Sequence, residues 1–351
     1  ALDCIGKLIT YSYFAFPSAE TENNATREQP PLIERAIDAI CDCFENEATA
    51  VEIQQQIIKS LLAAVLNDKI VVHGAGLLKA VRQIYNIFIY SKSSQNQQIA
   101  QGSLTQMVST VFDRVRTRMD LKELRVRELE KPSSTLDASA SDVGQTSETA
   151  SMPVADQPVT KEPTTEKLTL QSFESPKEVT GVNDNAPTTV TRAKRSATRS
   201  MSGIPEEKDD DSSAEDDVDE IYVKDAFLVF RALCKLSHKV LTHEQQQDVK
   251  SQNMRSKLLS LHLIHYLINN HTATFISPLA AIKNSSSSAD GMNLLLAVRP
   301  HLCLSLSRNG SSAVPHIFKV CCEIFWLMLK DMRVMMKKEL EVFLKEIYLA
   351  I

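Results

Sequence analysis

Two glycines stand where a phosphate-binding loop could form. Gly74 and Gly76 precede a predicted helix that contains Lys79. A Walker loop needs four residues between its glycines and then Lys-Ser or Lys-Thr, and the dinucleotide fingerprint needs a preceding strand and a third glycine. The sequence meets neither condition. We therefore interpret the two glycines as a flexible start of a helix and assign no cofactor-binding residue.

Histidines and cysteines are the other side chains that could do chemistry. His262 and His265 lie three residues apart with His271 nearby, but this segment otherwise offers only Leu, Ile, Tyr and Asn and no further zinc ligand. The cysteine pairs at 41/43 and 321/322 lack CxxC spacing. The sequence also lacks nucleophile-elbow, kinase and zinc-protease motifs. We predict structural histidines, buried thiols, no metal site and no catalytic residue.

A polar stripe on the helix predicted over residues 77–90 is the best candidate for binding a partner. Lys79, Arg82, Asn86 and Tyr90 recur at helical spacing, so they would share one edge of that helix. An exposed aromatic side chain beside positive charge is a common interface anchor, which singles out Tyr90. The competing interpretation is an ordinary solvated face. We treat the four residues as a hypothetical protein-binding site.

The composition favours an all-α protein. Of 351 residues, 43% are hydrophobic, enough for a substantial core, while 6% aromatics and nine glycines suit helices better than sheets. The net charge of -5 argues against a general nucleic-acid binder, which relies on clustered Lys and Arg. Seven cysteines in mostly apolar runs indicate reduced thiols of a cytoplasmic protein. No apolar run approaches the ~18 residues of a membrane span.

Apolar residues spaced three and four apart mark two helical regions. The first, residues 1–131, contains predicted helices over 2–16, 32–45, 47–67, 77–90 and 96–119, followed by a charged helical tail that ends at Pro132. The second, residues 221–351, contains helices over 222–237 and 253–270, two pieces around Pro300 and a long amphipathic end after Pro315. Short connectors between such helices favour an antiparallel helical stack.

The helix predicted over 222–237 is apolar on two sides. Phe227 and Phe230 belong to one face, and Val229 belongs to a second. Such a helix needs neighbours on both sides, so we expect the two regions to pack into one elongated armadillo/HEAT-like superhelix. The residues left for a solvated or functional edge are Lys224, Asp225, Arg231 and Lys235.

Residues 132–220 differ from both helical regions. They are rich in Ser, Thr, Pro and Asp, lack a sustained period, and cannot bury enough apolar surface to offset their ordering entropy. We predict a disordered linker. A basic, Ser-rich run over 192–199 and an acidic run over 206–220 are interpreted as solvating tracts. The alternative is a tether controlled by phosphorylation.

Six segments resemble, in order, the large Golgi exchange factors for Arf GTPases, the BIG and Sec seven family. LLKAVRQIYNIFIYSKS (77–93) and SLTQMVSTVFDRV (103–115) are similar to the dimerisation and cyclophilin-binding (DCB) domain. The segments similar to the homology-upstream (HUS) domain are KDAFLVFRALCKLS (224–237), SKLLSLHLIHYLINNH (256–271), LSRNGSSAVPHIF (306–318) and ELEVFLKEIYLAI (339–351). This resemblance implies that residues 1–131 are DCB-like and residues 221–351 are a HUS-like domain truncated at its end.

The resemblance implies a regulatory module and not an enzyme. The closing Asn-Tyr-Asp-Cys type box and the catalytic domain would follow Ile351. Family partners would be Arf or Arf-like small GTPases, the protein's own catalytic domain and a second copy in a homodimer. The location would be cytoplasmic, peripheral on trans-Golgi network membranes. We place the GTPase on the Lys79 face as a hypothesis. We expect Asn309 and Gly310 to form a turn.

Two other classes compete with this interpretation. An unrelated helical-repeat transport adaptor or scaffold should show a regular repeat of ~40 residues, and no such self-similarity is visible in the sequence. An undetected enzyme should bring ionisable residues together in a pocket with perturbed pKa values, which only a structure can reveal.

Overall fold

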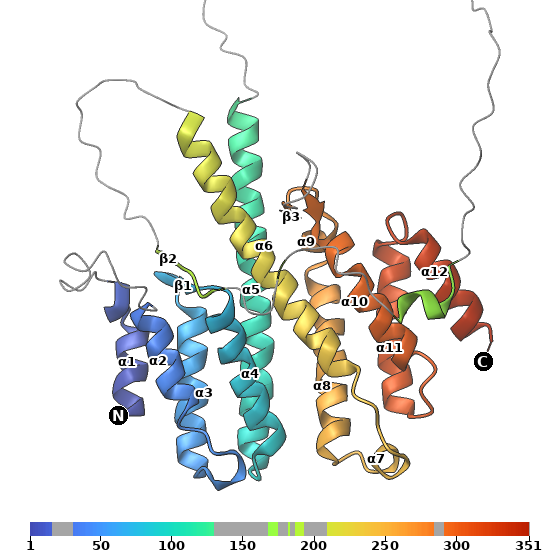
Figure 1. The fold of residues 1–351 in the computed structure, drawn as a ribbon, viewed down its shortest axis with the longest axis horizontal. Helices are drawn as coiled ribbons and strands as arrows, with labels where there is room; N and C mark the ends of the chain where they lie inside the picture. Colours follow the sequence, from blue (N-terminus) through green and yellow to red (C-terminus); the bar gives the residue numbers. More distant parts are fainter. Residues whose placement is uncertain are drawn as a thin grey trace, which may run out of the picture.

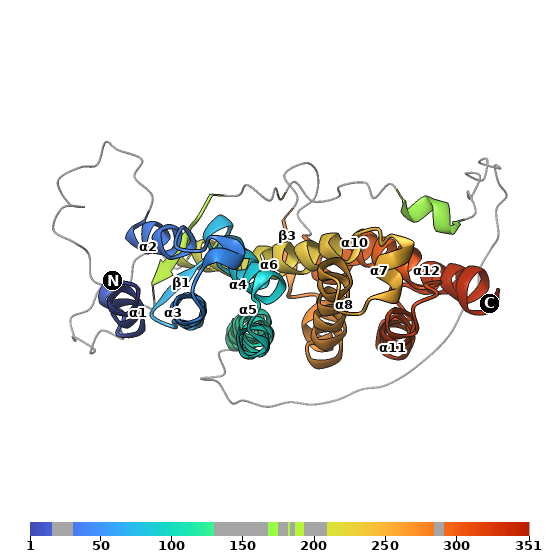
Figure 2. The same cartoon turned by 90° about the horizontal axis from the view of Figure 1, so that it is seen from below.

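The computed structural model describes residues 1–15, 31–129, 168–174, 182, 187–192, 209–283 and 291–350. In this part of the chain the regular structure is mostly helical, with two short two-stranded ladders and no closed sheet. The helices lie side by side along the longest axis, and α6 runs obliquely beside α5 (Figure 1). From below they form one elongated row (Figure 2). The expected helical class is confirmed.

The first half is built around α3, which contacts α1, α2, α4 and α5. The fully buried side chains of this half include Ile57 and Leu61 of α3, Ile84 of α4 and Phe112 of α5. The elements of this half are α1 (Leu2–Thr10), η1 (Tyr13–Ala15), α2 (Leu32–Cys41), η2 (Asn46–Ala48), α3 (Val51–Leu66), β1 (Ile70–Val72), α4 (Ala75–Tyr90) and α5 (Ser94–Leu129).

The second half is built around α8 and α10, which both contact α6. Its elements are α6 (Asp209–Ser237), α7 (His243–Gln247), α8 (Gln252–Asn270), α9 (Thr272–Ile276), β3 (Ala281–Ile282), β4 (Met292–Asn293), α10 (Leu294–Asn309), α11 (Pro315–Asp331), α12 (Lys337–Phe343) and η4 (Leu344–Tyr348). Two elements between the halves are η3 (Leu170–Phe173) and β2 (Val190–Arg192).

Three phenylalanines join the two halves. Phe275 of α9 is fully buried, and its ring centroid lies 5.2 Å from that of Phe112 in α5 and 5.2 Å from that of Phe230 in α6. Aromatic rings bury large apolar areas and add a favourable pair geometry at such distances. The short helix α9 therefore links α5 to α6 through one side chain.

The two-faced character predicted for residues 222–237 is confirmed. Helix α6 packs on α5, α8 and α10, and its Phe227 and Val229 are both buried. The expected solvated edge is wrong for Asp225 and Arg231, which are buried. Asp225 accepts hydrogen bonds from the start of α4, and Arg231 donates to the Val182 carbonyl oxygen at 2.9 Å. Burial is tolerated because these charges have hydrogen-bond partners.

The structure differs from the expected linker at several described residues. β2 pairs antiparallel with β1, with Val72 opposite Val190. Helix α6 begins at Asp209, within the run expected to be disordered. Arg125 of α5 contacts Glu215 at 2.5 Å and Asp219 at 2.5 Å. Opposite charges on adjacent helices therefore stabilise the acidic run as a helix. Most of the basic run over 192–199 lies outside the described residues, as do residues 16–30.

Several helix boundaries also differ from expectation, since α1 ends at Thr10 instead of 16 and α2 ends at Cys41 instead of 45. Residues 94–129 form one helix, α5, with no break before the charged tail, and α10 continues through Pro300. Proline removes one backbone hydrogen bond and usually breaks a helix. Here Val298, Leu302 and Cys303 are all buried, so tertiary packing outweighs the local preference.

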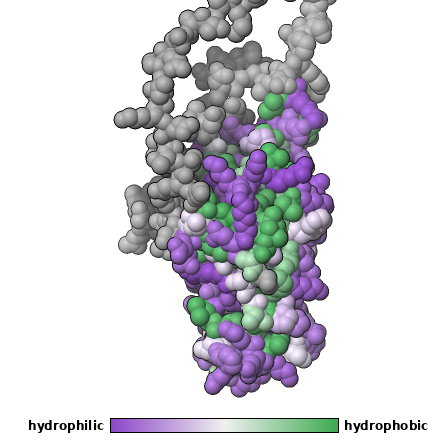
Figure 3. Space-filling view, turned by 90° about the vertical axis from the view of Figure 1, so that its right-hand side faces the viewer, coloured by the Kyte–Doolittle hydropathy of each residue, from purple (hydrophilic) through white to green (hydrophobic). Residues whose placement is uncertain are grey.

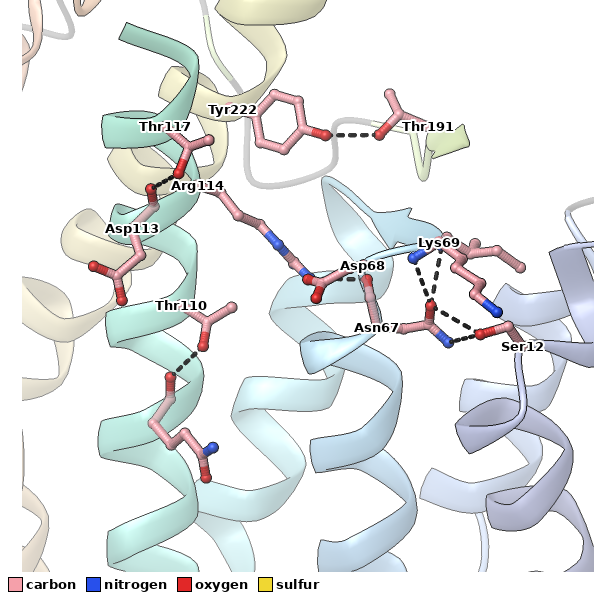
Figure 4. Close-up of polar contacts among 12 residues, drawn as sticks. Ser12, Asn67, Asp68, Lys69, Thr110, Asp113, Arg114, Thr117, Thr191 and Tyr222 are labelled. Carbon is pink, nitrogen blue, oxygen red and sulfur yellow. Dashed lines mark hydrogen bonds and ion pairs between the residues drawn. The ribbon is translucent and has the colours of Figure 1, made fainter. Parts of the chain in front are cut away.

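Asn67 connects the ends of α1 and α3 to β1 (Figure 4). Its Nδ2 donates to the Ile9 carbonyl oxygen at 2.8 Å, and its Oδ1 accepts from the backbone N–H groups of Lys69 and Ile70. Arg114 of α5 donates to the Asn67 carbonyl oxygen at 2.8 Å. These contacts satisfy backbone groups left free at helix ends and fix the approach to β1 and α4.

Candidate functional site

A buried polar contact joins the two halves where α4 starts. Gly74 has a φ of 65°, a conformation that favours glycine. Its backbone N–H donates to Asp225 Oδ1 of α6 at 2.9 Å, and His73 Nδ1 lies 2.6 Å from Asp225 Oδ2. The exposed fraction of Asp225 is 4%. We call these three residues, His73, Gly74 and Asp225, the seam.

The start of α4 is fixed, which corrects the expectation of a flexible segment. The Gly76 N–H donates to Thr188 Oγ1 at 2.9 Å, and a Cβ added at Gly76 would lie 2.9 Å from Thr188 Cγ2. Thr188 in turn donates to Glu34 Oε1 of α2 at 2.6 Å. The sequence could not reveal these contacts, because the partners of Gly74 and Gly76 lie 151 and 112 residues away.

Helix α4 is also attached to α8. The Tyr85 hydroxyl donates to the Ser256 carbonyl oxygen at 2.9 Å, and burial raises the pKa of Tyr85. Arg255 donates to the Phe88 carbonyl oxygen at 2.5 Å and lies over the Phe88 ring, 4.8 Å from its centroid. Together with the seam, these contacts fix α4 against both α6 and α8, so the space between α4 and α6 has a defined shape.

A groove of about 270 Å³ lies between α4 and α6. Its floor is apolar, and three basic residues, Arg82, Lys235 and Lys239, are among those that line it. Each of these three is exposed. An apolar floor beside positive charge suits a partner that brings an apolar anchor next to a carboxylate. The other lining residues are Leu78, Val81, Tyr85, Asn86, Leu104, Val229, Ala232, Leu233 and Leu236.

The structure brings two of the four predicted site residues together. Arg82 and Asn86 both line this α4–α6 groove. Lys79 does not line it, and its Nζ lies 2.6 Å from Asp38 Oδ1 of α2. Tyr90 is half-buried and packs against the core, so it is less exposed than an interface anchor was expected to be. Other helices pack on both sides of α4, so four residues on one stripe of this helix can lie in different surroundings.

Sequence reasoning missed the α6 wall of the groove. Ala232, Lys235 and Lys239 belong to a segment some 150 residues from α4, and no local pattern pairs them with Arg82. The only available signal was the second apolar face of residues 222–237, which required an unknown neighbour. The groove exists because α4 and α6 each present a second face at their junction.

The histidines and cysteines that could do chemistry lie within the described residues. No group of three His, Cys, Asp or Glu side chains there could hold a metal ion. His262 Nδ1 donates to the Leu258 carbonyl oxygen at 2.7 Å, and His271 lies 3.2 Å from Ser109 Oγ. Burial raises the pKa of Cys41 and Cys321 to about 12 each, which keeps both as thiols and removes their nucleophilicity at neutral pH.

Two family profiles match the two halves of the chain. The profile described as the Mon2/Sec7/BIG1-like dimerisation and cyclophilin-binding domain matches residues 1–119. The profile described as the Mon2/Sec7/BIG1-like HUS domain matches residues 222–351. The chain comprises the DCB and HUS domains of the Sec7/BIG1 family of Arf exchange factors. The resemblance inferred from the six sequence segments is therefore confirmed.

Relatives match across the whole of this DCB–HUS chain. It is 37% identical to the ADP-ribosylation factor guanine nucleotide-exchange factor sec71 of Schizosaccharomyces pombe, and 32% identical to SEC7 of Saccharomyces cerevisiae. It is 28% identical to the brefeldin A-inhibited guanine nucleotide-exchange protein 1 of Homo sapiens. In each case 100% of this chain aligns, with 17%, 16% and 24% of the relative's length. The chain thus covers the N-terminal part of these exchange factors, without the Sec7 catalytic region.

The groove lies at the junction of the DCB and HUS domains. Its α4 and α5 residues fall within the DCB match, and its α6 residues fall within the HUS match. At the far end of the HUS domain, apolar side chains gather among polar ones on the surface that carries α11 and α12 (Figure 3). Trp326 of α11 is 61% exposed. The described helices include none that is long and apolar enough to span a bilayer.

The HUS domain also contains a buried lysine. Lys257 of α8 is 6% exposed, and its Nζ donates to Asn309 Oδ1 at 2.6 Å. Asn309 Nδ2 donates to the carbonyl oxygens of Ser237 and Ser305, so this residue links α6, α8 and α10. The turn expected at Asn309 does not include these contacts, by which its side chain joins three helices in the core. Burial, together with the charge of Arg308, lowers the pKa of Lys257 to about 8.

This low pKa predicts a specific dependence of stability on pH. The folded-state pKa of about 8 lies below the ordinary value of 10.5, so the unfolded chain binds more protons between these values. The free energy of unfolding contributed by Lys257 therefore rises as pH increases from about 8 to about 10.5, and the penalty of burying the charge is fully present below pH 8. The charges of Arg308 and Cys321 act on Lys257, and the charge of Lys257 acts on His238.

Urea denaturation of the wild type and of Lys257→Met at half-unit steps from pH 7 to pH 10.5 tests this prediction. Because other groups titrate in both proteins, the informative quantity is the difference between the two free energies of unfolding. We expect this difference to change in favour of the wild type above pH 8. A difference that stays constant across the range would contradict a depressed pKa for Lys257.

Proposed function

We propose that this chain is the non-catalytic regulatory module of an Arf guanine-nucleotide exchange factor, and that it binds an Arf or Arf-like GTPase in the GTP-loaded state. The support comes from the DCB–HUS assignment and from the names of the relatives, which describe exchange factors for ADP-ribosylation factor. The observation that carries the binding proposal is the α4–α6 groove, which combines an apolar floor with Arg82, Lys235 and Lys239.

The chemistry of the groove suits a nucleotide-dependent partner. The switch segments of a GTPase are ordered by the γ-phosphate and its Mg²⁺ and are released after hydrolysis. An apolar floor gains the most binding free energy from a side chain already presented in a fixed position, because ordering a flexible segment costs entropy. Arg82 beside this floor would pair with a carboxylate of the GTPase, and Asn86 would hydrogen-bond to its backbone. The GDP form would present neither group in the required geometry.

The wider proposal follows the family. The module would recruit the exchange factor to trans-Golgi network membranes as a peripheral protein, form a homodimer through the DCB domain, and control the catalytic domain of the full-length enzyme. We also propose the division into residues 1–131, 132–220 and 221–351, with the helices arranged as an armadillo/HEAT-like superhelix. The rigid junction at the seam supports this control, since a partner in the groove would contact the DCB and HUS domains at once.

Recruitment to vesicles that carry a lipid-anchored Arf or Arf-like GTPase tests the binding proposal. We expect the wild-type chain to bind vesicles with the GTP-loaded form at least tenfold better than those with the GDP form. Arg82→Glu should weaken this recruitment at least tenfold, which corresponds to about 1.4 kcal/mol. Lys79→Glu should have a smaller effect, because Lys79 lies outside the groove and pairs with Asp38.

Arg333→Glu is the matched control. Arg333 is exposed, lies beyond the C-terminal end of α11 and does not line the groove, yet its substitution changes the net charge by the same amount. Circular dichroism should show that all variants are folded. Recruitment that ignores the bound nucleotide, or that Arg82→Glu and Arg333→Glu reduce equally, would argue against a GTPase site in the groove.

A further inference from the structure

A second cavity in the HUS domain contains an uncompensated positive charge. The buried Lys257 ammonium has Asn309 as its hydrogen-bond partner, and within the described part of the chain it forms no ion pair with a carboxylate. Burying an ammonium group is costly unless it is paired with an opposite charge. The amide oxygen of Asn309 supplies one acceptor for three N–H donors, which leaves two donors of Lys257 without an anion.

The cavity beside Lys257 has a volume of about 420 Å³ and lies between the ends of α6 and α10 and the loop that precedes α11. Arg308 and Lys239 line it with exposed cationic side chains that have no carboxylate partner among the described residues. No Asp or Glu side chain belongs to its lining. Three cations without an acidic neighbour are unusual in a chain whose net charge is -5.

An unpaired donor or acceptor in the wall of this cavity is an independent sign of a missing ligand. His238 lines the cavity, and its Nε2 atom is buried with no hydrogen-bond partner among the described residues. Buried polar atoms are nearly always satisfied by protein, water or a bound group. The hydroxyl groups of Ser311 and Ser312 also line the cavity and can each donate a hydrogen bond. Helix α11 begins nearby, at Pro315, so its positive dipole end adds to the field.

The pKa values of two side chains in the cavity wall indicate a positive electrostatic potential there. Burial and the charges of Arg308, His301 and Lys257 lower the pKa of His238 to about 4, and burial and Arg308 lower that of Lys257 to about 8. A neutral His238 can donate from Nε2, and a protonated Lys257 would be favoured by an anion. A bound anion would raise the pKa of both His238 and Lys257, because a nearby negative charge favours the protonated form of each.

We propose that this cavity binds a phosphomonoester, through Lys257, Arg308, Lys239 and the donors of His238, Ser311 and Ser312. A phosphoryl group carries about -1.5 to -2 charges at pH 7 and three acceptor oxygens, which matches several cations and hydroxyl donors better than one carboxylate would. The volume lies within the range of small-ligand sites, about 300–1,000 Å³, so the ligand is larger than phosphate alone. A soluble sugar or inositol phosphate and a phosphoinositide headgroup share this chemistry.

Calorimetric titration of the folded chain with inorganic phosphate and with inositol 1,4-bisphosphate tests the site. We expect saturable binding of both probes, tighter for inositol bisphosphate, and at least tenfold weaker binding by Arg308→Gln. Lys257→Met should abolish binding while remaining folded, because it replaces a buried charge by an apolar side chain of similar length. The matched control is Arg333→Gln, beyond the other end of α11, a helix about 25 Å long, and this variant should bind as the wild type does.

Vesicle flotation distinguishes the two sources of the phosphoryl group. Vesicles with a phosphatidylinositol monophosphate are compared with phosphatidylserine vesicles of equal surface charge. Binding to the first alone, lost in Arg308→Gln, identifies the lipid headgroup; binding of inositol bisphosphate without vesicle binding identifies a soluble ligand. Both results support the site. The proposal is overturned if neither probe binds, or if Arg308→Gln and Arg333→Gln weaken binding equally.

Discussion

Replacing Asp225 by alanine is expected to lower the free energy of unfolding by about 2–6 kcal/mol, since each of two buried groups left unsatisfied costs about 1–3 kcal/mol. The two groups are the Gly74 N–H and the His73 ring, both of which contact the Asp225 carboxylate. The loss falls where α4 meets α6, so hydrogen exchange should increase first at β1 and the start of α4. Chemical denaturation followed by circular dichroism measures the size of the effect.

Two further substitutions on α6 make this prediction specific. Asp225→Asn keeps an oxygen that can accept from Gly74 N–H and an amide that can donate to His73, so we expect it to cost much less than Asp225→Ala. Asp217 lies on the same helix, is exposed and pairs with Lys283 at 2.7 Å. Exposed ion pairs contribute little to stability, so Asp217→Ala should be nearly neutral. Equal losses for Asp217→Ala and Asp225→Ala would refute a special role for the seam.

Phe275→Ala is expected to destabilise the protein by about 3–5 kcal/mol, the usual cost of removing a buried phenylalanine ring. Its ring is fully buried and contacts the rings of Phe112 and Phe230 on two different long helices. The resulting cavity would lie at the junction of α5, α6 and α9. Because that junction joins the DCB and HUS domains, the variant should also lose cooperativity, which appears as a lower denaturant slope in urea.

The adjacent residue supplies the control for Phe275→Ala. Ile276 belongs to the same helix but is 39% exposed, so Ile276→Ala removes apolar atoms without opening a cavity at the junction. We expect it to cost well under half as much, with an unchanged denaturant slope. Phe275→Leu should be intermediate, since leucine fills part of the space. A similar loss for Phe275→Ala and Ile276→Ala would show that the aromatic cluster does not join the domains.

Local periodicity predicted the helices well because it reflects which face of each helix is buried. The two-faced helix over 222–237 is the clearest case: Phe227 and Val229 lie on different faces and are both buried in α6. Its charged positions could not be predicted. A charged residue within a helix suggests solvent, yet Asp225 and Arg231 are buried against partners at positions 74 and 182 that no local pattern connects to them.

The candidate sites were only partly visible in the sequence for the same reason. Arg82 and Asn86 were placed on an outward face of α4, and both line the groove, but its α6 wall comes from a distant segment. The sequence does not single out Lys257, because a lysine among leucines usually extends its charged end to water. Only the packing of α8 against α6 and α10 shows that its ammonium group is enclosed.

Lys239 lines both the α4–α6 groove and the cavity beside Lys257. One ammonium group cannot take its best position for two anions at once, so a ligand in the cavity and an acidic partner in the groove would compete for it. Thermodynamic linkage then makes the antagonism mutual: each ligand weakens the other by the same factor. A single flexible side chain could in this way make the module respond to one signal at the expense of the other.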